Sequence, residues 1–209
     1  MQTKIRGIDR VSGDEIDIYA GNRHDLYVSE LLPKYSHLVL QGAGAIVQAT
    51  TAVATVVADP TTASLGTLYN GETGGGKVYI IDQVFFDIWK IDTSHIGWVH
   101  MVGCIQPVGV ITTHVADITI RTRLGDAYGG SGIFDVGHTV VDHGWFPISN
   151  SVEAGPSTNE YGGHCVIQNV EGRICLKPTA ALGTSVISDD TDVTTMVGVA
   201  WFEVDVDYS

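Results

Sequence analysis

The sequence has few charged residues, and few of those are basic. Asp, Glu, Lys and Arg make up 17% of the 209 residues, below the usual quarter or so of soluble domains. Only 11 residues are basic and 24 are acidic, which gives a net charge of −13 at pH 7. Such a surface repels phosphate, so we expect no direct binding of nucleic acid. The low charge fits either a surface buried against partner subunits or a Gly- and Thr-rich β protein that exposes hydroxyl groups.

Cysteines are scarce, and long apolar runs are lacking. Cys104, Cys165 and Cys175 are an odd number without CxxC spacing, which argues against a disulfide framework. Each lies in a strand-like run, so we expect three buried, reduced thiols. No apolar run approaches the roughly 18 residues of a membrane span, and the first residues have no signal-peptide pattern. These features predict synthesis in a reducing cytosol and no membrane partner.

Helical periodicity is almost missing. Only residues 25–32, which Pro33 follows, predict a helical turn or two. The remainder consists of short runs of Val, Ile, Thr and aromatic residues separated by Gly, Asp and Asn. About eight to ten strands, roughly ten residues apart, predict an all-β fold. We expect a two-sheet antiparallel β-sandwich of jelly-roll type. We expect a single domain over residues 1–209, with residues 1–20 as an N-terminal arm.

Several strands can be located individually. Residues 37–41 are short and apolar, residues 77–89 form the most convincing long strand, and residues 194–207 predict a last strand that belongs to the sheet. The doublets at 80–81 and 85–86 break the alternation of the long strand. They predict either a strand covered on both faces or a bulge that resets the register.

No residue pattern matches an enzyme motif. His138, Asp142 and His143 suggest a metal site, but on a strand the first two share one face and the third points away. Residues 71–77 fit Gly-x-x-x-x-Gly-Lys, yet Val78 stands where a phosphate loop needs Ser or Thr, so a loop between two strands explains them better. We predict a protein that is not an enzyme and has no cofactor. A hydrolase or metal enzyme with a site near these histidines is the third alternative.

Aromatic residues in predicted loops are the candidates for contact with partner subunits. Residues 144–161 are polar and contain two prolines, so they predict a long surface loop. Residues 125–132 form a Gly-rich loop. The interface candidates in these two loops are Trp145, Phe146, Pro147, Tyr161 and Tyr128.

Tryptophans also allow a carbohydrate-binding function. Trp145, in a predicted loop, is the best candidate for an exposed aromatic contact with a sugar. The acidic turn at residues 189–192 supplies the hard oxygen ligands that calcium prefers, although it lacks the EF-hand pattern. The other three tryptophans lie in strand-like apolar runs, and we expect them in the core: Trp89, Trp98 and Trp201.

Two stretches resemble segments in structural proteins of tailed phages and environmental viruses. The first comprises residues 59–72 and 75–82, and the second is Val-Gly-Val-Ala-Trp-Phe-Glu-Val at 197–204. Together they cover a small part of the chain. The resemblance implies a virion shell, decoration or fibre protein of β-sandwich fold, made in the host cytoplasm, without catalytic residues.

The leading hypothesis is therefore a virion structural protein that assembles with copies of itself. Other virion proteins are further partners, and nucleic acid and membrane are not. Subunits would associate through strand edges, exchanged termini and residues 144–161. The alternative is a lectin-like β-sandwich that binds carbohydrate, with or without calcium.

Overall fold

The structure is a computed structural model that describes residues 4–8, 15–19, 35–60, 64–90, 97–106, 118–138, 140, 144–154, 164–189 and 192–206. The chain forms two compact units, Met1–His37 and Leu38–Ser209. The first contains β1 (Lys4–Ile8) and β2 (Glu15–Tyr19), which pair antiparallel with Ile5 opposite Ile18 and Arg6 opposite Asp17. The expected arm at residues 1–20 therefore contains a strand pair.

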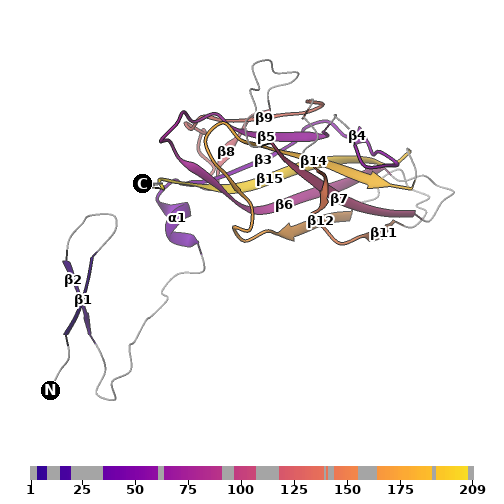
Figure 1. The fold of residues 1–209 in the computed structure, drawn as a ribbon. Coiled ribbons are helices and arrows are strands. Elements are labelled where there is room, and N and C mark those ends of the chain that lie inside the picture. The colour runs from indigo at the N-terminus through magenta and orange to yellow at the C-terminus, as the bar shows by residue number, and fades with distance from the viewer. Residues whose placement is uncertain are drawn as a thin grey trace. The chain divides into compact units, whose positions relative to one another are not determined.

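The second unit contains two antiparallel sheets, as the sequence predicted (Figure 1). The seven-stranded sheet comprises β3 (Gly44–Gln48), β4 (Val53–Ala54), β6 (Val78–Lys90), β8 (Arg121–Thr122), β12 (His164–Asn169), β13 (Cys175–Leu176) and β15 (Thr194–Val204). The six-stranded sheet comprises β5 (Gly66–Asn70), β7 (Gly97–Gln106), β9 (Gly132–Asp135), β10 (Phe146–Pro147), β11 (Val152–Ala154) and β14 (Ala181–Ser188).

The strand order is that of a jelly roll. Four strands of each sheet carry the topology, in the orders β3-β15-β6-β12 and β5-β14-β7-β10. Along the chain, the first of these strands pairs with the last, β5 pairs with β14, β6 with β12, and β7 with β10. This nested pairing produces two packed sheets from one folded-over ribbon. The short strands β8 and β9 extend the opposite side of the two sheets.

A bulge in β6 resets its register, in agreement with the apolar doublets. The pairing with β15 shifts between Ala200 and Trp201, which leaves Asp82 as an extra residue on β6. The side chains that are at most 1% exposed occupy odd positions before the bulge and even positions after it: Tyr79, Ile81, Val84, Phe86 and Ile88. A bulge lets one long strand keep its apolar residues toward the core although the sequence does not alternate strictly.

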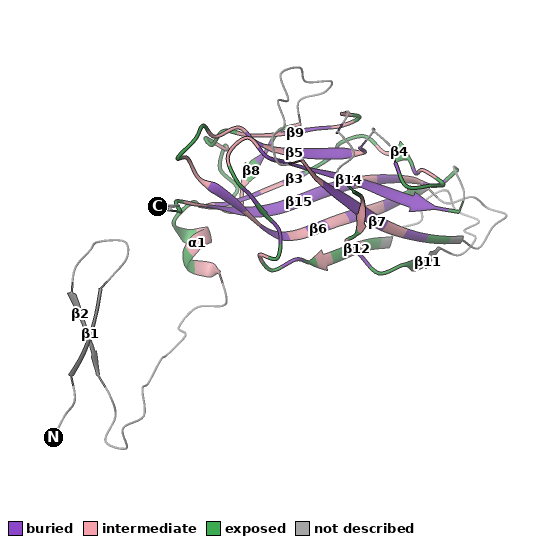
Figure 2. Ribbon diagram, in the orientation of Figure 1, coloured by how far each residue is buried: buried purple, intermediate pink, exposed green. Residues whose placement is uncertain are grey.

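The core lies between the sheets and is centred on β14 and β15, which are buried along almost their whole length (Figure 2). These two strands lie centrally in their sheets, so each has neighbours on both sides. Small residues let the layers approach closely. A Cβ at Gly66 would lie 2.5 Å from Val197 Cγ2 and 2.7 Å from Phe134 Cζ. The core therefore requires glycine at this position.

The prediction of a strand at residues 37–41 is wrong. The segment forms the short helix α1 (Ser36–Leu40). Gly42 follows with a φ of 76°, and its N–H donates to Val39 O at 2.9 Å. A left-handed glycine after the last turn is a common helix stop. The apolar run was too short to distinguish a strand from one helical turn. The helical turn predicted at 25–32 lies outside the described residues.

The long surface loop expected at residues 144–161 is only partly a loop. Phe146 and Pro147 form β10, and residues 152–154 form β11, and both pair with β7. Residues 155–161 lie outside the described part of the chain. Proline is tolerated here because β10 is an edge strand, where one side of the backbone has no ladder partner.

Candidate functional site

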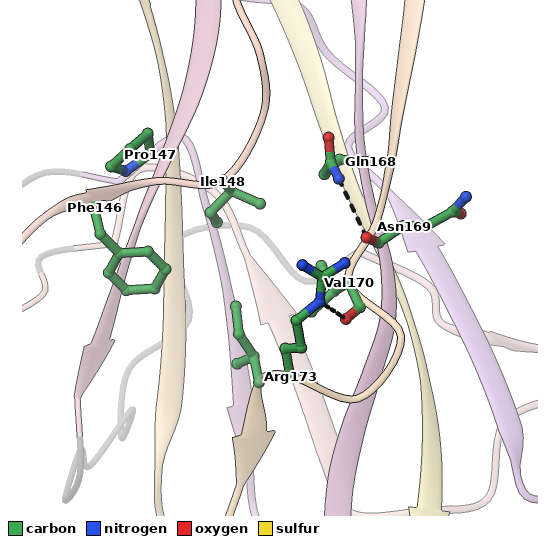
Figure 3. Close-up of a pocket in the computed structure, with 8 residues that line it drawn as sticks. Phe146, Pro147, Ile148, Gln168, Asn169, Val170 and Arg173 are labelled. Carbon is green, nitrogen blue, oxygen red and sulfur yellow. Dashed lines mark hydrogen bonds between the residues drawn. The ribbon is translucent and has the colours of Figure 1, made fainter.

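A groove of about 260 Å³ opens along one side of the sandwich, where the edges of the two sheets meet. One wall comes from β10 and the residue after it, and the other from β12 and the turn that follows (Figure 3). The lining residues are Phe146, Pro147, Ile148, Gln168, Asn169, Val170, Arg173 and Ile174. The groove therefore lies between two segments that are about twenty residues apart in the sequence.

Hydrogen bonds hold the polar wall of this groove in place. Gln168 Nε2 donates to Asn169 O at 3.2 Å, and Arg173 Nε donates to Val170 O at 3.2 Å (Figure 3). Gln83 Nε2 donates to Asn169 Oδ1 at 2.9 Å from the neighbouring strand. Among the described residues that line the groove, Arg173 is the one with a charge. The site thus combines an apolar wall with amide groups and a single cation.

Three of the predicted interface residues lie at this groove or beside it. Phe146 is half-buried and packs against the core, whereas Pro147 is exposed. Trp145 is also half-buried, and its Nε1 is buried without a hydrogen-bond partner. Pro147 is thus the accessible member of the three. Trp145 is less accessible than a tryptophan in a solvent-exposed loop would be.

Tyr128 lies elsewhere, on the side of the sandwich that carries β8 and β9. It lines a second pocket of about 320 Å³ together with residues 118–120 and 132–134. Its hydroxyl donates to Glu203 Oε1 and accepts from Gly132 N at 2.8 Å. Glu203 also accepts from Trp201 Nε1 at 3.3 Å. These hydrogen bonds attach the 125–132 loop to the core. The Tyr128 side chain therefore contributes mainly to the stability of the fold.

Burial changes the acidity of this cluster. Desolvation raises the pKa of Tyr79 above its usual value, and so do the nearby carboxylates of Glu203 and Glu72. Desolvation and the hydrogen bond to Glu203 raise the pKa of Tyr128 as well. The two hydroxyl oxygens lie 3.2 Å apart. Both phenols therefore stay neutral across the physiological range, as a structural network requires.

The sequence did not indicate Gln168, Asn169 and Arg173 as members of a site. They approach Phe146 only because β12 and β10 occupy the same side of the two sheets. The fifth interface candidate, Tyr161, lies outside the described residues.

Two tryptophans expected in the core are exposed. Trp201 is fully buried as predicted, but Trp89 is 48% exposed and Trp98 is 42% exposed. Trp98 lies near the start of β7 and stacks on His100, with ring centroids 5.0 Å apart. Each is next to a core residue on its strand, Ile88 or Val99, and successive side chains point to opposite faces, so both tryptophans lie on the outer face of their sheet. An apolar run alone does not reveal this position.

Two of the three cysteines also differ from the prediction. Cys104 is buried, but Cys165 and Cys175 are exposed. The latter two lie on β12 and β13, whose outer faces have no layer of the sandwich above them. Desolvation and the Asp87 carboxylate raise the pKa of the Cys165 thiol. A raised pKa lowers the thiolate fraction, so this exposed thiol is a poor nucleophile.

The described residues contain no group of three or more His, Cys, Asp or Glu that could hold a metal ion. His138 is half-buried, while Asp142 and His143 lie outside the described residues. Asp189 and Asp192 are exposed on the turn before β15. Residues 71–77 form the loop between β5 and β6, as predicted. Within the described ranges, no helix is long and apolar enough to cross a lipid bilayer.

Comparisons with protein-family models, with curated proteins and with solved structures find no match for this chain.

Proposed function

We propose that this chain is a virion structural protein, a capsid, decoration or fibre subunit that assembles with copies of itself. The observation that carries the proposal is the side of the sandwich formed by β10 and β12. In a chain with a net charge of −13, none of the described residues that line the groove on this side is acidic. Copies of an acidic protein repel each other least where acidic side chains are absent.

Several further features support self-assembly. Pro147 and Ile167 expose apolar surface at or beside the groove, and Arg173 supplies a cation that complements the many acidic residues of a second copy. The jelly roll is compatible with this role, although one fold serves many functions. The resemblance of residues 59–72, 75–82 and 197–204 to virus structural proteins supports a virion subunit in particular.

The mass of the full chain in solution tests the proposal. Light scattering after gel filtration, across a range of micromolar concentrations, should give a mass well above 22.3 kDa. Negative-stain images should show rings, shells or filaments of defined symmetry. A monomer at every concentration would contradict the proposal.

Exposed tryptophans favour carbohydrate binding as a second candidate. The indole of Trp98 is stacked on His100, and a supported, exposed ring can pack against the apolar face of a sugar. Glycan-array binding that is lost in Trp98→Ala and kept in Trp201→Phe would favour this function. Addition of calcium or a chelator would show whether Asp189 and Asp192 contribute.

A further inference from the structure

In the part of the chain that the structure describes, the edge strand β12 lacks the features by which β proteins usually prevent edge-to-edge pairing. Such edges are protected by short length, charged side chains, proline or a cover. β12 has six residues, His-Cys-Val-Ile-Gln-Asn, and none of them is Asp, Glu, Lys, Arg or Pro. Ile167 at its centre is 58% exposed. This strand is therefore open to pairing with another strand.

The other described edges of the sandwich are protected. β8 has two residues, including the exposed Arg121, and β10 has two, including Pro147. β11 has three residues and contains Glu153. β9 has four residues and contains Asp135. β4 and β13 also pair on one side only, and they have two residues each. Among the described edges, β12 is the longest and the only one of more than two residues without a charge or a proline.

Alternate residues of β12 present their backbone groups to the open side. Val170 N donates to Asp82 O at 2.7 Å at the end of this ladder. In an antiparallel ladder, residues whose backbone groups bond to the partner strand alternate with residues whose backbone groups point away from it. The even-numbered residues of β12 therefore bond to β6. The backbone N–H and C=O groups of Cys165, Ile167 and Asn169 then point to the open side. Asn169 O agrees with this assignment, because it accepts from a side chain, Gln168 Nε2.

The strand is complementary to itself. If two copies of β12 run antiparallel about a two-fold axis at Ile167, this residue lies opposite its own copy. Cys165 then lies opposite Asn169 of the second copy, and Val166 opposite Gln168. No pair contains two like charges, which would be destabilising when directly opposite. For a chain with 24 acidic residues, an uncharged edge favours a second copy of the same chain as its partner.

We infer that two copies of this protein associate through β12, with their seven-stranded sheets joined across a two-fold axis at Ile167. The inference rests on the proposed self-assembly and names one of its contacts. Such an isologous interface uses the same surface patch on both subunits. In this arrangement a charge of either sign introduced at position 167 lies opposite the same charge on the second copy and weakens the contact. A contact between two different patches does not predict this.

Charge substitutions test the contact in the full chain. Ile167→Asp and Ile167→Lys should each weaken self-association by about fivefold, as measured by light scattering over a concentration series. Leu124→Asp is the matched control, because Leu124 is 49% exposed and follows β8 on the other side of the sheet. The control should leave assembly unchanged. Weakening by Asp alone, with Lys neutral or favourable, would overturn the two-fold arrangement.

A cross-link tests the same contact without a change in charge. Ile167→Cys in a Cys165→Ser, Cys175→Ser background should form a covalent dimer under mild oxidation, seen on a non-reducing gel. Residues directly opposite in an antiparallel pair are about 4.5–5.5 Å apart at Cα, within disulfide range. Leu124→Cys in the same background should stay monomeric on that gel.

The outcomes separate the contact from the function. Assembly that survives both charge substitutions, without a cross-link at 167, would overturn the β12 contact and leave the assembly proposal intact. A wild-type chain that is monomeric at every concentration would overturn both. Charge-sensitive assembly together with the cross-link at 167 would support both.

Discussion

Arg123 and Asp82 form an ion pair that spans the seven-stranded sheet, with Nη1 of the arginine 2.7 Å from Oδ2 of the aspartate. Arg123 follows β8 at one edge, and Asp82 is the bulge residue of β6. The Arg123 side chain lies over Phe202 of β15, with its guanidinium carbon 5.2 Å from the ring centroid. It also lies next to Gly44 of β3, where a Cβ would be 2.9 Å from Cδ of the arginine. One side chain thus connects four strands.

Removal of this cation should destabilise the fold. Arg123→Met keeps the apolar stem over Phe202 but leaves Asp82, which is 8% exposed, without its charged partner. We expect the free energy of unfolding to fall by about 1.5–3 kcal/mol, the range for hydrogen bonds to charged groups. Urea unfolding followed by tryptophan fluorescence measures the change.

A double-mutant cycle supplies the control for this pair. Asp82→Asn in the Arg123→Met background should cost much less than in the wild type, because the carboxylate already lacks its partner. Equal costs in the two backgrounds would show that the pair is not coupled.

Because the sheets pack closely at Gly66, we expect a single methyl group added there to lower the stability of the fold substantially. Gly66→Ala would force Val197 or Phe134 to move, and overpacking of this kind costs about 1–3 kcal/mol. Gly74→Ala is the matched control, since nothing lies within 4 Å of a Cβ at that position. Thermal unfolding measures the midpoints of both variants, and equal midpoints would contradict this packing.

The tyrosine cluster predicts a loss of stability at high pH. Burial raises the pKa of Tyr79 and Tyr128 above the ordinary value of about 10. The folded chain therefore keeps its protons at a pH where the unfolded chain loses them. The stabilisation is complete below pH 10 and declines as the pH rises further. Urea midpoints measured at pH 9 and pH 11 should show this decline.

Tyr128→Phe isolates the contribution of one hydroxyl. The variant should be less stable at pH 7 by about 1–3 kcal/mol, because Glu203 and Gly132 N lose a hydrogen-bond partner. Its decline between pH 9 and pH 11 should be smaller than that of the wild type. The same decline in both proteins would mean that this phenol does not titrate with unfolding.

The sandwich should fold without the N-terminal unit. Its core cluster consists of residues between Ala45 and Trp201, and the first unit ends at His37. A chain that begins at Tyr35 should keep its cooperative thermal unfolding, with a midpoint shift below about 2 °C. Calorimetry at matched concentration measures the midpoint. A non-cooperative transition would show that the first 34 residues complete the fold.

The long strands could be predicted from the sequence because their signals are local. The segment at 77–89 corresponds to β6, and a bulge was one of the two interpretations that its apolar doublets allowed. The last strand was also predicted within a few residues of β15. The five-residue helix α1 was missed, because an apolar run of that length fits a strand equally well.

Of the eight described residues that line the groove, the sequence pointed to two, as interface candidates. Phe146 and Pro147 stood out as an aromatic and a proline in a polar segment. Gln168 and Arg173 did not, because neither residue type is unusual after a strand. Their role depends on which strand of the other sheet lies beside them, and the pattern within either segment does not indicate that contact.

The fold class could be predicted from the sequence alone, because short β-branched and aromatic runs with glycine-rich turns favour strands that pair into sheets. Which strands are central and which are edges depends on the assembled sheets. Trp201 and Trp98 come from similar apolar runs, yet one is buried and the other is exposed. Burial depends on neighbours supplied by distant segments. For the same physical reason, the open edge at Ile167 became visible only after the two sheets were assembled.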